Sequence, residues 1–144
     1  MAVSGGVNPL YTPGSKVSMA VSAAVTAGKL VEVSGSNTIA TASQNSRKVV
    51  GVALQSASAS GDIISVQLLG YIFKLKAEGA VTAGDELAAG GTGGEGDVST
   101  LAVDTTATLN ETTVEAAMAV ARAVVGIALE DIADEGTGKV LVRV

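Results

Sequence analysis

The chemistry open to this 144-residue chain is limited at the outset, because it contains no histidine and no cysteine. Without them it lacks the usual general base, the thiol nucleophile and the commonest nitrogen and sulfur ligands of metal ions. Carboxylates are the reactive groups that remain. Their densest cluster lies in one acidic turn and consists of Glu130, Asp131, Asp134 and Glu135.

An acidic turn of this kind can bind calcium, because Ca²⁺ prefers carboxylate and carbonyl oxygens. Its spacing differs from that of an EF-hand loop, which needs Asp or Asn at alternate positions around a glycine and a final glutamate. The corresponding turn of an internal repeat, described below, carries Gln55, Ser56 and Ser58 in place of the acids. A solvated acidic turn is therefore the favoured interpretation, with a cation site as the alternative.

The glycine-rich stretch at 88–97 is a second segment whose composition suggests a ligand. A phosphate-binding P-loop needs Gly-Lys-Ser/Thr at the start of a helix, but this stretch has no lysine and carries Glu95 and Asp97. Because its glycines show no periodicity, we predict a mobile loop without a phosphate site. The residues thus predict a non-enzymatic protein with no catalytic, cofactor-binding or metal site.

The elements that carry these side chains come from an internal repeat. Val-Thr-Ala-Gly at 25–28 returns unchanged at 81–84, and Val-Val-Gly-Val-Ala-Leu at 49–54 returns as Val-Val-Gly-Ile-Ala-Leu at 124–129. The first pair is offset by 56 residues and the second by 75, so the second copy carries 19 additional residues. Each copy ends in alternating apolar residues, which is typical of a strand with one buried face. Two copies are too few for a solenoid.

We therefore predict a mainly β protein, a compact barrel or sandwich built from two similar halves. Residues 17–144 are expected to form a single β-rich domain, with one repeat at 17–76 and the other at 77–144. The near-continuous apolar runs predict strands buried on both faces, and Gly51 indicates a bulge or a close backbone crossing. The predicted core residues are Val50, Val52, Leu54, Val125, Ile127 and Leu129, together with Phe73.

One amphipathic helix is predicted at about 113–123, within the insertion of the second repeat. Thr112 can cap it, with Glu115 completing a capping box. Its apolar residues at helical spacing form one stripe. Arg122 falls in the last turn, where the helix dipole favours a cation.

Residues 1–16 are predicted to form an extended arm. Its prolines exclude a helix, and its few apolar side chains would gain little from a solvent-exposed position. We predict that the arm binds a partner through Pro9, Leu10, Tyr11 and Pro13. The alternative is a frayed terminus.

Composition excludes several classes of partner. The net charge of −5 and a pI near 4.6 argue against nucleic acid, which requires clustered Lys and Arg. No run of 18 apolar residues is present to span a membrane, and no basic stretch followed by an apolar core indicates a secretory signal.

The twin Val-Val-Gly-(Val/Ile)-Ala-Leu strands, the Val-Thr-Ala-Gly-Asp-Glu-Leu turn at 81–87 and the closing Val-Arg-Val resemble a family of tailed-phage and prophage proteins. The characterised members of this family are capsid decoration proteins, also called head-stabilisation or cement proteins. The resemblance covers residues 17–144. It implies a β-rich homotrimer that is made in the host cytoplasm, binds the major capsid protein on the outer surface of the virion and stabilises the head.

Two other classes of function stay open. A phage fibre base or a glycan-binding β module would also be non-catalytic, although sugar stacking favours exposed aromatic side chains, and the chain has only Tyr11, Tyr71 and Phe73. An enzyme would have to work with carboxylates alone, as glycosidases do.

Overall fold

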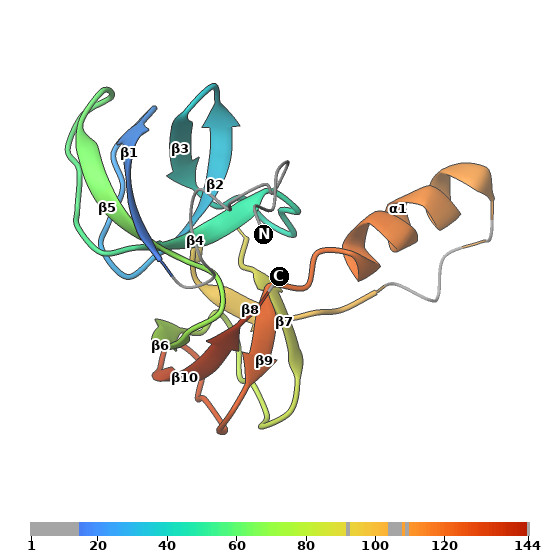
Figure 1. The fold of residues 1–144 in the computed structure, drawn as a ribbon. Coiled ribbons are helices and arrows are strands. Elements are labelled where there is room, and N and C mark those ends of the chain that lie inside the picture. The colour runs from blue at the N-terminus through green and yellow to red at the C-terminus, as the bar shows by residue number, and fades with distance from the viewer. Residues whose placement is uncertain (1–14, 92, 104–107, 109, 144) are drawn as a thin grey trace, which may run out of the picture.

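The computed structural model describes residues 15–91, 93–103, 108 and 110–143, which form two β bodies and a projecting helix (Figure 1). The mainly β class and the single inserted helix predicted from the sequence are confirmed for these residues. The arm residues Pro9, Leu10, Tyr11 and Pro13 lie outside the described part of the chain, so their predicted role stays a prediction.

The first half of the chain forms a closed five-stranded barrel in the order β1-β3-β2-β4-β5. Closure comes from β1, which pairs parallel with β3 and antiparallel with β5. The strands are β1 (Lys16–Val21), β2 (Leu30–Gly35), β3 (Thr38–Thr41), β4 (Val49–Ala53) and β5 (Ile63–Leu68).

The second half repeats this arrangement as a five-stranded sheet in the order β6-β10-β9-β7-β8. The two ends of the sheet meet at a parallel bridge between Ala77 and Val98, which corresponds to the β1–β3 pairing of the first barrel. The strands are β6 (Ile72–Lys76), β7 (Glu86–Ala89), β8 (Val98–Thr100), β9 (Gly126–Ala128) and β10 (Thr137–Val142).

The repeated sequence motifs make the same hydrogen bonds in both halves. The N–H of Gly28 donates to the carbonyl of Ala53, and the N–H of Gly84 donates to the carbonyl of Ala128, each at 2.8 Å. Both glycines have positive φ, 86° and 91°, which a glycine adopts without steric cost. The Val-Thr-Ala-Gly motif is therefore a turn that ties the start of one strand to the Val-Val-Gly strand.

Gly51 shows the close backbone approach expected from the sequence, and Gly126 shows the same feature in the second half. A Cβ added to Gly51 would collide with the backbone carbonyl of Gln67, and one added to Gly126 would collide with that of Leu141. The pairing between β2 and β4 also shifts register beside Gly51. Glycine is thus required where the Val-Val-Gly strand crosses the last strand of each half.

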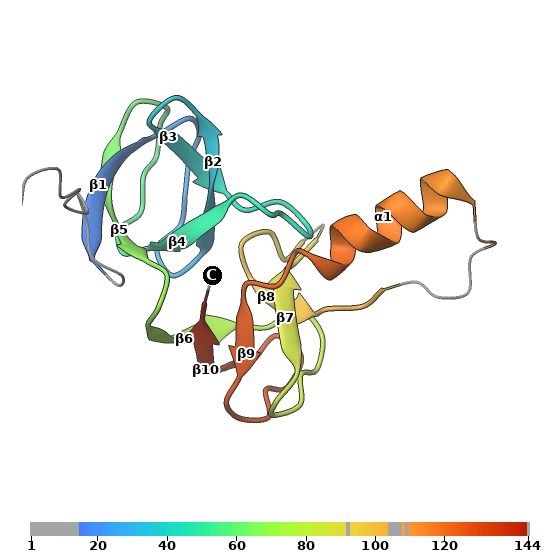
Figure 2. The ribbon, with the colours of Figure 1, turned by 45° about the vertical axis from the view of Figure 1, so that its right-hand side comes forward.

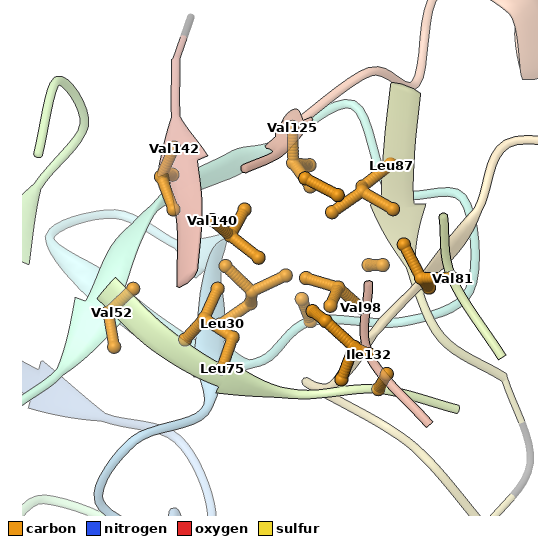
Figure 3. Close-up of a cluster of buried hydrophobic side chains, with 14 residues drawn as sticks. Leu30, Val52, Leu75, Val81, Leu87, Val98, Val125, Ile132, Val140 and Val142 are labelled. Atoms are coloured by element: carbon orange, nitrogen blue, oxygen red, sulfur yellow. The ribbon is translucent and has the colours of Figure 1, made fainter. Parts of the chain in front are cut away.

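The two halves share a core. The interior of the first barrel is one cluster of buried side chains, but the interior of the second half also takes in Leu30, Ala42 and Val52 from the first. Leu30 and Val31 are adjacent and both fully buried, because Val31 points into the first barrel and Leu30 packs on the second half. Figure 3 shows Leu30 and Val52 beside side chains of the second half.

The prediction that all six residues of the Val-Val-Gly runs are core is correct for Val52 and Val125 and wrong for Leu54 and Leu129. The two leucines are 38% and 44% exposed. Each lies one residue past the end of its strand and belongs to neither cluster of buried side chains. Val50 and Ile127 are half-buried, and Phe73 is half-buried against the shared core.

Helix α1 spans Glu111–Ala121, two residues earlier than predicted. The cap predicted at Thr112 with Glu115 is wrong: the N-cap is Asn110, whose side chain accepts from the N–H of Thr113 at 2.9 Å. The Thr113 hydroxyl accepts in return from the N–H of Asn110 at 2.9 Å, which completes the capping box. Figures 1 and 2 show the helix projecting from the β bodies.

The prediction of a mobile glycine-rich loop at 88–97 is also wrong. The stretch begins within β7, and most of the glycines that follow are buried. Gly91 and Gly96 lie against the first half, and Gly90 and Gly94 lie against Glu78. Gly96 accepts a hydrogen bond from the N–H of Leu30 at 2.7 Å and donates one to the carbonyl of Ala42 at 3.1 Å. A Cβ at Gly96 would lie 2.7 Å from Cγ2 of Thr41. The glycines therefore permit close packing between the two halves.

Candidate partner-binding surface

Every carboxylate of the acidic turn has a partner within the protein, so the turn has a structural role. Among the described residues, no three His, Cys, Asp or Glu side chains converge to hold a metal ion. Three of the carboxylates accept backbone N–H groups at 2.8 Å, and the fourth forms an ion pair. The pairs are Glu130 with Lys139, Asp131 with Ala83, Asp134 with Gly79, and Glu135 with the ammonium of Lys76.

The first half makes two of these bonds without a negative charge. The side-chain oxygen of Gln55 accepts from the N–H of Ser65 at 3.0 Å, as Glu130 does from Lys139. The hydroxyl of Ser56 accepts from the N–H of Ala27 at 2.9 Å, as Asp131 does from Ala83. Hydrogen-bond acceptance therefore explains why a side chain with an acceptor oxygen stands at both positions in each half.

A second charged group lies at the junction of the two halves. Asp97 is only 2% exposed and forms an ion pair with Lys29 of the first half. The ammonium of Lys76 lies 3.9 Å from Asp97 and contacts Glu135. The hydrogen bond from Lys76 to Glu135 raises the pKa of Lys76 above its ordinary value. Each of these charges is paired with an opposite charge of the same protein, and the pair between Asp97 and Lys29 links the two halves.

Helix α1 presents exposed apolar side chains to its surroundings. None of its residues is buried, and Val114 and Met118 on one face are 41% and 51% exposed. Its two charges, Glu111 and Glu115, lie in the N-terminal half, and residues 116–121 are Ala, Val and Met. An isolated helix of this length is only marginally stable in water. Packing against a surface outside this copy of the chain would stabilise it.

A cleft of about 150 Å³ lies where the helix joins the body. Three guanidinium groups line it, together with apolar and hydroxyl side chains: Arg47, Arg122, Arg143, Ser46, Val49, Leu69, Val124 and Val125. A second depression of about 300 Å³, lined by Glu32, Ser43, Ser46, Arg47 and Lys48, adjoins it through the two shared residues.

The charge of this cleft is largely unneutralised. Arg143 pairs with Glu86 at 3.1 Å, but no carboxylate in the described part of the chain forms an ion pair with Arg47 or Arg122. A concentration of positive charge in a chain of net charge −5 attracts carboxylates. Sequence reasoning missed the cleft because four separate segments contribute to it and no local pattern joins them.

No protein-family model matches the chain, and no curated protein sequence matches it. Among solved structures, its fold is similar to that of the N base of head fibre gp8.5 from bacteriophage phi29. The TM-score is 0.59 at 18% sequence identity, and the match covers 89% of this chain and 92% of that one. The likeness therefore extends over both halves. Among the described residues, no helix has the length and apolar character needed to cross a membrane.

Proposed function

We propose that this protein is a non-enzymatic structural component of a phage particle, which binds the outer surface of the assembled capsid and stabilises it. The observation that carries this proposal is the fold similarity to a phage head-fibre base over almost the full length of both chains. The motif resemblance to capsid decoration proteins supports the same role. The major capsid protein is the proposed partner, and a homotrimer the proposed state.

The physical character of the molecule supports a binding role. The buried cluster of the second half includes Leu30, Ala42 and Val52 of the first half, which favours a rigid body acting as a single β-rich domain over residues 17–144. The carboxylates of its acidic turn are engaged by backbone N–H groups and a lysine. Many copies on a symmetric shell would gain avidity without requiring strong individual contacts.

The N-terminal arm is the proposed contact with the capsid protein or with a neighbouring subunit. In an extended segment Leu10 and Tyr11 would face opposite sides, so one can enter a groove while the other packs on its rim. Pro9 and Pro13 restrict the free chain and reduce the entropy lost on docking. Such a segment can add to a sheet edge through main-chain hydrogen bonds.

Co-sedimentation with capsids tests the proposal. Purified protein is mixed with capsids of the phage that encodes it, stripped of the native copies, and the bound fraction is measured against protein concentration. We expect saturable binding and capsids that survive heating to a higher temperature. A variant lacking residues 2–14 is expected to melt like the full chain but bind more weakly. Protein that stays in the supernatant at all concentrations would contradict capsid binding.

A fibre base is the second candidate, favoured by the head-fibre neighbour itself. A fibre base and a decoration protein both attach to the capsid, but only the base carries further projecting material. Electron microscopy of intact virions separates them: density that ends with the two β bodies indicates decoration, and density that continues outward indicates a fibre.

A further inference from the structure

The acidic end of helix α1 cannot reach the arginine cleft of its own copy. Glu111 lies ten residues from Ala121, which places it about 15 Å along the helix axis at 1.5 Å per residue. Arg122, at the opposite end of the helix, lines the cleft. The helix is straight and projects away from the β bodies (Figures 1 and 2). Glu111 therefore lies far from the cleft of the copy that carries it.

The helix and the cleft have complementary properties. The helix offers two carboxylates that form no ion pair among the described residues, and an apolar face on which Val114 and Met118 are exposed. The cleft offers Arg47 and Arg122, which form no ion pair with any carboxylate of the described residues, beside apolar side chains. Opposite charge and matching apolar surface are the properties that select one partner over others.

We infer that helix α1 of one copy docks on the arginine cleft of a second copy of this chain. This deepens the proposed function, because it names the contact that would join the subunits of the proposed trimer. The cleft accommodates side chains rather than a whole helix, so Glu111 or Glu115 enters it while Val114 and Met118 pack along its rim. Each copy then gives a helix and receives one.

Such a contact is heterologous, because the donated surface differs from the receiving one. Heterologous contacts close into rings when the rotation between copies permits it, and a ring of three gives a trimer. The alternative of helices pairing side by side and parallel would bring the glutamates of different copies together and repel them.

Charge reversal tests the contact in the absence of capsids. The association constant is measured by sedimentation equilibrium for the full chain, for Glu111→Lys/Glu115→Lys and for Arg47→Glu/Arg122→Glu. We expect each pair of reversals to weaken association by about tenfold or more, and an equimolar mixture of the two variants to recover it in part. The matched controls, Glu95→Lys and Lys74→Glu, change exposed charges outside the arm, the helix and the cleft and should associate like the full chain.

Thiol cross-linking distinguishes helix-to-cleft docking from helix pairing, since the chain has no cysteine of its own. Thr112→Cys lies beside Glu111, and Lys48→Cys lies beside Arg47, so both variants keep the charges in question. A short bismaleimide cross-linker should join the two variants when they are mixed and leave each variant alone largely unlinked.

Several results would overturn the inference. They are a full chain that stays monomeric at high micromolar concentration, reversals that leave association unchanged, or Thr112→Cys linking only to itself. Charge reversals that abolish capsid binding but leave self-association intact would also overturn the inference, because the helix would then bind the capsid and not a second copy. Capsid binding is measured separately by co-sedimentation, so the proposed function can stand or fall independently.

Discussion

The two halves of the molecule follow the same strand plan but differ in two connections. The turn between β2 and β3 occupies residues 36–37, whereas its counterpart between β7 and β8 occupies 90–97. The connection between β3 and β4 occupies 42–48, whereas its counterpart between β8 and β9 runs from 101 to 125 and contains the helix. The strands and their motif turns thus determine the fold, and the lengthened connections determine how the halves join and what they present outward.

The two lengthened connections run in opposite directions relative to the β bodies. The first packs inward, where Gly96 bonds to the backbone of Leu30 and Ala42 and its neighbour Asp97 pairs with Lys29. The second extends outward as an exposed helix. One insertion therefore stabilises the contact between the halves, and the other presents an exposed helix.

The halves also fill corresponding core positions with different side chains. Ala57 and Ile64 lie in the first core, and their counterparts in the second half are Ile132 and Gly138. A Cβ added to Gly138 would fall on the side chain of Ile132. The large and small residues have exchanged places, which preserves the packed volume.

The largest loss of stability is expected from substituting the glycine at the close strand approach, a feature that both halves share. Gly51→Ala or Gly126→Ala places a methyl group on a backbone carbonyl that cannot move aside without separating the strands. We expect each to lower the free energy of unfolding by about 4 kcal/mol or more, as measured by urea denaturation.

Gly28→Ala is the control for these two glycine substitutions. Its φ is 86° but the space around it is open, so only the left-handed backbone costs energy, about 1 kcal/mol. Equal losses of unfolding free energy for the alanine variants of Gly28, Gly51 and Gly126 would show that the Val-Val-Gly strands do not closely approach the last strand of each half.

Exchanging core residues between the halves should have the next largest effect. Ile132→Ala alone is expected to cost about 3 kcal/mol through the cavity it leaves, and Gly138→Ile alone should clash with Ile132. The double variant reproduces the pairing of Ala57 with Ile64, so we expect it to cost at least about 1 kcal/mol less than the sum of the single changes. If the losses of unfolding free energy measured by urea denaturation simply add in the double variant, Ile132 and Gly138 do not pack against each other as Ala57 and Ile64 do.

The exposed leucines at the strand ends should show a smaller effect. Because Leu54 and Leu129 are 38% and 44% exposed, replacing either with alanine is expected to cost about 1 kcal/mol. Leu30→Ala is the matched comparison: Leu30 is fully buried between the halves, and its loss should cost about 2–5 kcal/mol. Thermal or urea unfolding of the three alanine variants measures the loss of stability in each and so ranks them. A large loss at Leu54 or Leu129 would mean that another copy buries it.

These leucines show how far the sequence predicts the fold. The repeat and its alternating residues predict the strands, and the turn glycines at 28 and 84 follow from the motif. The apolar run continues one residue past the end of each strand, and where the strand ends is set by its pairing in the folded sheet, which no local pattern contains. For that reason the core prediction holds for Val52 and fails for Leu54.

The glycine-rich stretch and the helix cap illustrate two further limits. Composition does not separate a flexible glycine loop from one whose glycines are needed for close packing, because both lack side chains. Thr112 and Asn110 are both suitable N-caps, and the path of the chain into the helix selects Asn110. The arginine cleft combines four distant segments, so it requires the folded arrangement of both halves.

The smallest change in stability is expected in the acidic turn, where substitutions of Glu130 test how closely this turn matches its uncharged counterpart. Glu130 accepts the N–H of Lys139 as Gln55 accepts that of Ser65, so Glu130→Gln keeps the acceptor and should change the free energy of unfolding by less than about 0.5 kcal/mol. Glu130→Ala removes the acceptor and should cost about 1 kcal/mol. Denaturation with and without Ca²⁺ distinguishes the two roles of the carboxylate. If Ca²⁺ stabilises the original chain but not the Glu130→Gln variant, the charge serves a cation after all, and the turn differs in function from its counterpart in the first half.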